Sequence, residues 1–149
     1  MATVTAKTSI NINAQPEDVF EYIKNLKYHY YWNPSLRMLS HEGELEEGMS
    51  YETESVVLKD IVVKSHNHVT KLVPNKEIDV ANSMGTVKYE SSITLANRSH
   101  ATLVVCRIDV LTESKVFGLT LPVLKQLAQK ELQTDLKALK FAVENNIGK

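Results

Sequence analysis

Hydrophobic and polar residues alternate along the first dozen positions of the chain. The apolar side is formed by Val4, Ala6, Ile10 and Ile12, and the polar side by Thr5, Lys7, Ser9 and Asn11. A period of two predicts a strand with one buried face. The spacing becomes helical in AQPEDVFEYIKNL, where Pro16 suits a first helical position and apolar residues recur on one side. That side is formed by Val19, Phe20, Ile23 and Leu26.

Turn signals divide the segment from Leu36 to Leu111 into six predicted strands. The breaks are HEGELEEG, Lys59-Asp60, VPNKE, NSMG and ANRSHA. Alternation is clearest in VKYESSITL and TLVVCRIDV, where every second residue belongs to one face. Tight connections favour antiparallel pairing, so the seven strands predict one strongly bent antiparallel sheet.

The last segment, from about Leu121 to Asn145, has the pattern of a long amphipathic helix. Its apolar stripe consists of Leu124, Ala128, Leu132, Leu136, Leu139 and Val143. A stripe of this length needs a surface to cover, and the concave face of the sheet is the candidate. The whole pattern predicts an α+β fold with one strand, two short helices, six strands and a long C-terminal helix.

Four of the ten aromatic residues fall within KYHYYWNP, directly after the first predicted helix. The pattern predicts a second short helix or turn that ends at Asn33-Pro34, because a residue before proline is displaced from helical geometry. Such rings combine an apolar body with a polar edge, which suits a place that is partly apolar and partly hydrated.

Length and charge indicate one ordinary globular domain spanning residues 1–149. The net charge is −1 and the composition is 43% hydrophobic, so no basic face for nucleic acid is expected. A single cysteine, Cys106, excludes an internal disulfide and suits a reducing compartment. The N-terminal segment has no continuous apolar run, so we expect neither a signal peptide nor membrane insertion, and a cytoplasmic location.

Few side chains have the spacing of a reactive or metal site. His66 and His68 share one face of a strand, but no third ligand is assured, so we expect them to be exposed and no metal to be bound. Cys106 lies between apolar positions and is expected to be a buried, unreactive thiol. The chain has no nucleophile elbow, phosphate loop or dinucleotide fingerprint, so no cofactor is expected.

The order β-α-α-β6-α resembles the helix-grip fold of the START and Bet v 1 superfamily, particularly its bacterial branch of polyketide cyclase/dehydrase-like proteins. The resemblance covers nearly the whole chain. It rests on INAQPEDVFEYIKNL, on WNPSL, on the Gly43 to Gly48 loop followed by MSYETES, and on DLKALKFAVE. It implies a cavity between the long helix and the bent sheet, with the aromatic segment near one end. The rings of that segment then either close the end of the core or line a ligand entrance.

The resemblance also indicates which residues line that cavity. The expected ligand-binding residues are Phe20, Tyr31, Trp32, Tyr51, Thr53, Asn67, Tyr89, Ser91, Leu121, Leu124 and Ala128. The sheet positions expected to face inward are Tyr51, Thr53, Ser55, Ile61, Val63, Ser65, Asn67, Val69, Ile78, Val80, Tyr89 and Ser91. They form an apolar surface with a few hydroxyl and amide groups, as in small-molecule pockets. We expect no Asp, Glu, Lys or His on the inward faces, which disfavours acid–base catalysis by carboxylates.

Three functions remain open at this stage. The first is a carrier or sensor for a small hydrophobic ligand such as a lipid, polyketide or quinone. The second is a polyketide cyclase/dehydrase-like enzyme in which Tyr51, Tyr89 or Asn67 orients a substrate. The third is a protein-interaction module of the chaperone-cofactor kind with a small or filled cavity. A monomer or weak homodimer is expected, since the open sheet has free edges.

Overall fold

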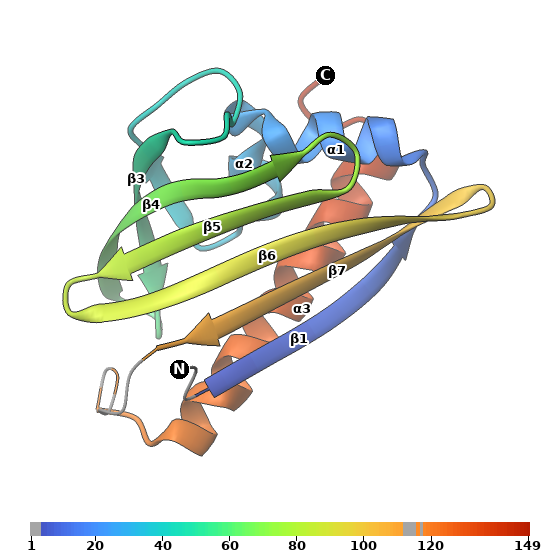
Figure 1. Ribbon diagram of the computed structural model, residues 1–149. Coiled ribbons are helices and arrows are strands. Elements are labelled where there is room, and N and C mark those ends of the chain that lie inside the picture. The colour runs from blue at the N-terminus through green and yellow to red at the C-terminus, as the bar shows by residue number, and fades with distance from the viewer. Residues whose placement is uncertain (1–3, 112–115, 117) are drawn as a thin grey trace.

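The computed structural model describes residues 4–111, 116 and 118–149, and they form seven strands and three α-helices (Figure 1). The first part of the chain contains β1 (Val4–Ile12), α1 (Pro16–Lys24), a 3-10 turn (Leu26–Tyr28), α2 (His29–Trp32) and β2 (Leu36–Leu39). The remainder contains β3 (Ser50–Val57), β4 (Ile61–Val73), β5 (Glu77–Met84), β6 (Val87–Arg98), β7 (Ala101–Val110) and α3 (Leu121–Glu144). The predicted α+β order is confirmed.

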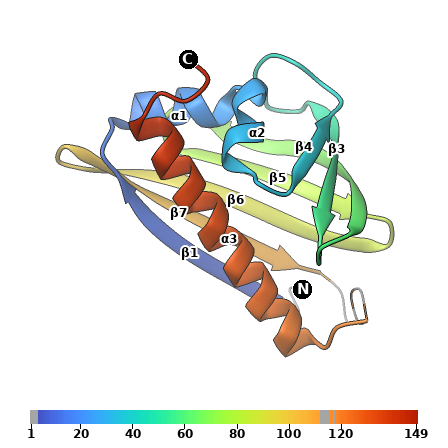
Figure 2. The same cartoon turned by 180° about the vertical axis from the view of Figure 1, so that it is seen from behind.

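All seven strands belong to one antiparallel sheet with the order β1-β7-β6-β5-β4-β3-β2. Neighbours in sequence pair in every case except β1, which pairs with β7 at the opposite end of the chain. The sheet bends around α3, which lies diagonally across its concave face, while α1 and α2 lie at one end of the helix (Figure 2). This is the predicted helix-grip arrangement.

Most of the core lies between α1, α3 and the inner face of the sheet. Leu136 and Leu139 of α3 are buried almost completely, as are Val69 and Val104 of the sheet. A second, smaller cluster occupies the end of the molecule near the start of α3. It consists of Val4, Val110, Val116 and Leu124. The apolar stripe of α3 is therefore divided: Leu124 packs in the small cluster, and the residues from Leu132 onward pack in the main core.

The aromatic segment is divided between the interior and the surface. Tyr28 stacks on Tyr22 of α1, with ring centroids 4.4 Å apart, and the Tyr22 hydroxyl donates to the carbonyl of Ile147 at 2.9 Å. Sequence reasoning did not place Tyr22 on the buried side of α1, although it is fully buried. Tyr30 is exposed and its hydroxyl accepts a hydrogen bond from the backbone N–H of Leu39 at 2.9 Å. The segment therefore holds β2 through Tyr30 and packs through Tyr28 on Tyr22, which bonds the C-terminal residues.

Candidate ligand-binding site

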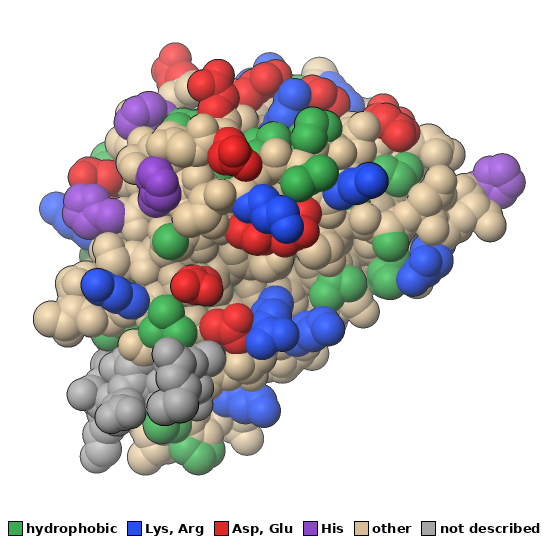
Figure 3. Space-filling model, viewed as in Figure 1, with side chains coloured by type: hydrophobic (Ala, Val, Ile, Leu, Met, Phe, Trp, Pro, Cys, Tyr) green, Lys and Arg blue, Asp and Glu red, His purple; other side chains and the backbone are tan. Residues whose placement is uncertain are grey.

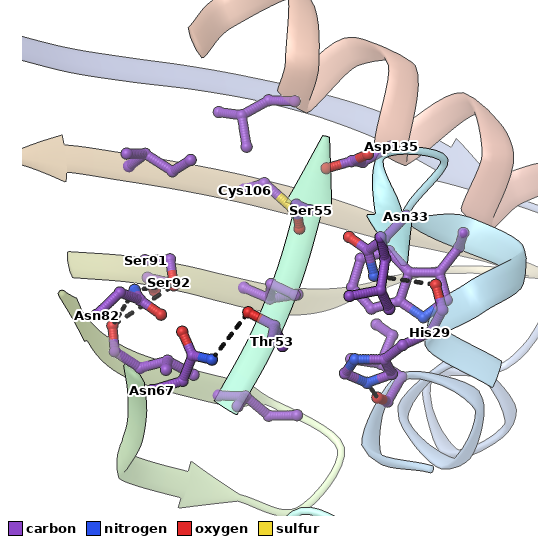
Figure 4. A pocket seen from close by; sticks show the side chains of 18 of the residues that line it. His29, Asn33, Thr53, Ser55, Asn67, Asn82, Ser91, Ser92, Cys106 and Asp135 are labelled. Carbon is purple, nitrogen blue, oxygen red and sulfur yellow. Dashed lines mark hydrogen bonds between the residues drawn. The ribbon is translucent and has the colours of Figure 1, made fainter. Parts of the chain in front are cut away.

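A cavity of about 230 Å³ lies between α3, α2 and the inner face of the sheet (Figure 4). Its wall combines apolar side chains with hydroxyl, amide and carboxyl groups. The apolar part includes Ile23, Trp32, Leu36, Leu45, Ile78, Val80, Ile93, Ile108 and Leu132. The polar part includes His29, Asn33, Ser35, Tyr51, Thr53, Ser55, Asn67, Asn82, Tyr89, Ser91 and Asp135.

The amide of Asn67 organises the polar wall on β3 and β4. Its Nδ2 donates to the Tyr51 carbonyl at 3.3 Å and to the Thr53 hydroxyl at 3.2 Å, while its Oδ1 accepts from the Ser65 hydroxyl at 2.9 Å. The Tyr89 hydroxyl lies 3.3 Å from the same serine oxygen. Burial raises the pKa values of Tyr51 and Tyr89, so both phenols stay protonated at neutral pH. The network holds polar groups at the cavity wall in fixed positions.

A second polar group lies on β5 and β6, and its Asn82 was missed by sequence reasoning, whereas its Ser91 was expected. The Asn82 Nδ2 donates to the Ser91 hydroxyl and to the Val80 carbonyl, both at 3.0 Å. Asn82 is two residues beyond Val80, which was expected to face inward, so a strict period of two continued by one step predicts its position. The prediction for this strand included only Ile78 and Val80 as inward positions.

Asp135 of α3 also lies in the cavity wall, on the side of Cys106 (Figure 4). Burial raises its pKa to about 8, with a further contribution from the negative charge of Glu131. Its Oδ1 atom is buried and has no hydrogen-bond partner among the described residues. The expectation that no acidic group faces inward is therefore wrong. Asp135 is three residues after Leu132, a spacing that places both on one side of the helix, whereas the prediction concerned the inward faces of the strands.

The end of the cavity near α2 is formed by His29 and Trp32, both buried. Burial lowers the pKa of His29 to about 4, and the neutral ring lies with Nε2 2.7 Å from the Ile23 carbonyl, so Nε2 carries the proton and donates it. The Trp32 ring meets the His29 ring edge to face at 5.1 Å. The Trp32 Nε1 atom is buried without a hydrogen-bond partner in the described part of the chain.

Of the expected binding residues, six line the cavity and five do not. The six are Trp32, Tyr51, Thr53, Asn67, Tyr89 and Ser91. Phe20 is buried in the main core instead, because α1 turns it away from the cavity, and Ala128 packs against the same core. Leu121 and Leu124 belong to the second cluster. Tyr31 is 49% exposed, with its ring against the backbone of Gly148 near the end of the chain.

Cys106 is buried in the cavity wall, as predicted. Burial raises the pKa of its thiol to about 12, and the negative charge of Asp135 acts in the same direction. A thiol with so high a pKa has almost no reactive thiolate at neutral pH. The cysteine therefore contributes apolar surface.

His66 and His68 are exposed, as predicted, on the opposite face of β4 from Asn67. With His41 and Glu52 they border a shallow depression on the outer surface of the sheet. His66 Nδ1 lies 3.1 Å from the Glu52 carboxylate, and His68 Nδ1 lies 2.8 Å from the Ser50 hydroxyl. The described residues contain no group of three or more His, Cys, Asp or Glu side chains that could hold a metal ion.

Charges of both signs are mixed over this outer face of the sheet (Figure 3). Histidine side chains lie at the left of the view and at its far right edge, and lysines and arginines alternate with acidic residues between them. Among the helices formed by the described residues, none is long and apolar enough to cross a membrane.

Solved structures of similar fold come from bacteria and from other sources. A START superfamily protein from Mycobacterium smegmatis has a TM-score of 0.78 and 19% identity, over 95% of this chain and 97% of that one. DynU16, a protein of the dynemicin biosynthetic locus, has a TM-score of 0.71 and 15% identity, over 95% of this chain and 48% of that one. Ara h 8.0201 has a TM-score of 0.69 and 14% identity, over 95% of this chain and 97% of that one. These likenesses establish the fold.

No curated protein sequence matches the chain. A family model does match, over residues 1–144, and its description names polyketide cyclases, dehydrases and lipid transport. These are functions of a fold that binds hydrophobic molecules. Because the match covers almost all of the 149 residues, the chain belongs to the polyketide cyclase / dehydrase and lipid transport family.

Proposed function

We propose that this protein binds a small hydrophobic ligand in the cavity between α3 and the sheet, as a carrier or sensor. The observation that carries the proposal is the cavity itself, where apolar side chains surround two fixed sets of hydrogen-bonding groups on the sheet. An apolar pocket with a few ordered polar groups is the usual form of a small-molecule site.

The volume restricts the size of that ligand. Pockets for drug-sized molecules measure roughly 300–1,000 Å³, and this cavity of about 230 Å³ is below that range. We therefore expect one aromatic ring, or a short chain with one ring, to be enclosed. A larger lipid, polyketide or quinone would place only part of its structure between α3 and the sheet.

The test is native mass spectrometry of the purified protein, followed by extraction and identification of any bound compound. An added mass is expected, and Tyr89→Ala should reduce its occupancy more than His66→Ala, because Tyr89 lines the cavity and His66 is on the outer face. Unchanged occupancy in the Tyr89 variant, with loss in the His66 variant, would place the site outside the cavity.

A second candidate function is a reaction of the cyclase or dehydrase kind, and Asp135 is the observation that favours it. A carboxyl group with a pKa of about 8 in a cavity can donate or accept a proton near neutral pH. The protonated phenols of Tyr51 and Tyr89 can polarise a carbonyl. This function predicts that the extracted compound is converted on incubation with fresh protein, to a product lighter by one water after dehydration or to an isomer of equal mass after cyclisation, and that Asp135→Asn does not convert it.

A further inference from the structure

Two residues of the cavity wall contain a polar atom that the protein itself leaves without a partner. Trp32 Nε1 is a hydrogen-bond donor and Asp135 Oδ1 belongs to a carboxyl group; both atoms are buried and unpaired among the described residues. Native proteins satisfy nearly all of their buried polar groups, so each exception needs an explanation. A third such atom, Asp79 Oδ1, belongs to a residue outside the cavity wall.

The wall offers no positive charge to a ligand, among the residues that the structure describes. Arg107 contributes to the wall, but its side chain is half exposed and pairs with Asp109 at 3.0 Å, away from the inner face. His29 is neutral because burial lowers its pKa to about 4. A ligand carboxylate would therefore be desolvated in the cavity with no cation to pair with it.

We propose that the cavity selects an uncharged ligand with a carbonyl or hydroxyl oxygen, which the Trp32 N–H and the Asp135 carboxylic acid bind by hydrogen bonds. This inference rests on the proposed binding function. The proposal requires that side-chain rotations present both buried groups to the oxygen, and such rotations are common when a ligand binds. A neutral oxygen accepts from both donors, whereas an alkyl group leaves them unpaired.

The proton on Asp135 makes this selection sensitive to pH. The other titratable side chains at the cavity wall are His29 of α2, Tyr51 of β3, Tyr89 of β6 and Cys106 of β7. The pKa of His29 is about 4, and burial raises the pKa of Cys106 to about 12 and those of both tyrosines above their usual value. On α3 itself, Glu131 lies one turn before Asp135 and accepts a hydrogen bond from Ser35. Asp135 is therefore the group of this set that changes charge between pH 6 and 9.

The experiment compares two molecules of the same shape, butyrophenone and butylbenzene, which differ by one carbonyl. Trp32 is the only tryptophan, so its indole N–H signal in a ¹⁵N-labelled sample reports binding directly. The measured quantity is the ratio of the two dissociation constants in the wild-type protein and in Asp135→Leu. The hydration of the two free compounds in water does not depend on the protein, so it cancels when the ratios for the wild type and the variant are compared. We expect the preference for butyrophenone to fall about tenfold in the variant.

A pH series gives an independent measurement. In the wild-type protein, the dissociation constant of butyrophenone should rise about tenfold per pH unit above pH 8, since only the protonated site binds. In Asp135→Asn it should stay constant, because the amide does not titrate. This variant also serves if Asp135→Leu does not fold.

The outcomes separate the two proposals. If neither compound shifts the Trp32 signal, the binding function is overturned. If both bind with the same ratio in wild type and Asp135→Leu, or with no pH dependence, the protein binds hydrophobic molecules and the role of Asp135 is overturned.

Discussion

The two halves of α3 have the same apolar pattern in the sequence and opposite surroundings in the structure. In the first half, Leu124 packs into a closed cluster with Val4, Val110 and Val116. Near the middle of the helix, Leu132 and Asp135 line a cavity, and from Leu132 onward the stripe belongs to the main core together with Leu136 and Leu139.

The difference arises on the sheet and not on the helix. Opposite the start of α3, the ends of β1 and β7 supply valines that fill the space. Opposite its middle, β3 to β6 supply Thr53, Asn67, Asn82 and Ser91, which bond to one another and leave space. Tyr89 and Ile108 contact the closed cluster and also line the cavity, so they form the partition between the two regions. An amphipathic stripe predicts a buried helix but not what it is buried against.

The largest effect that distinguishes the regions is expected from leucine truncation. Leu136→Ala removes a side chain that is 1% exposed in the main core, and should lower the free energy of unfolding by about 3–4 kcal/mol. Leu124→Ala, in the small cluster, should lower it by about 2 kcal/mol or less. Urea denaturation measures both. Equal losses would contradict the division of the core into two clusters.

A second effect, which depends on pH, is expected at Asp135. Its folded-state pKa is about 8 and its ordinary pKa is 3.8, so between these values the folded protein holds a proton that the unfolded chain has released. Stability therefore falls as pH rises from about 4 to 8, and the loss is complete above pH 8. Asp135→Asn removes this loss. At about 1.4 kcal/mol per pKa unit, the variant should be more stable than the wild type by several kcal/mol at pH 8, with little difference at pH 4.

Thermal denaturation at a series of pH values measures this change, at roughly 2–4 °C per kcal/mol for a chain of this size. Glu90→Gln is a matched control, because Glu90 is an exposed carboxyl on β6, and it should follow the wild-type profile. A constant difference between Asp135→Asn and wild type over this range would mean that Asp135 is ionised in the folded protein.

The smallest effect is expected on the outer side of α3. Val123 in the first half is 42% exposed and Phe141 in the second half is 65% exposed. Val123→Ser and Phe141→Ser should each change the free energy of unfolding by less than about 0.5 kcal/mol, since exposed positions bury little surface. Denaturation midpoints give the comparison. A large loss for one of them would show that the two halves also differ on their outer side.

The sequence predicted the fold well because its signals are local and repeated. Alternation, turn residues and the 3.6-residue stripe each fix an element, and the strand period also predicted that Asn67 faces inward and His66 outward. The cavity was harder to predict. Leu121 and Leu124 satisfy the same stripe as Leu132, and the side chains that the sheet presents opposite each position decide which of them meets empty space.

Asp135 shows a second reason for the difference. A carboxyl group on the boundary of an apolar stripe is usually a solvated residue, so the pattern assigns it to the outside. Its burial depends on how close α2 and β7 approach the helix, and these contacts join parts of the chain far apart in sequence. Tyr31 is the opposite case: it belongs to the aromatic segment, where Tyr28 and Trp32 are buried, but its own side chain is exposed.

The side chains of α3 that meet β1 have a consequence for association. β1 is at the edge of the sheet, and the amide of Gln129 both accepts from the Lys7 N–H at 3.1 Å and donates to the Lys7 carbonyl at 2.6 Å. Further along, Lys140 donates to the Asn11 carbonyl and the Glu144 carboxylate accepts from the Asn13 N–H, both at 2.8 Å. An unpaired edge is a template for strand addition from another molecule, and here α3 already occupies the peptide groups of Lys7 and the carbonyl of Asn11. The helix that packs on the sheet thus also occupies part of the edge that strand addition would use.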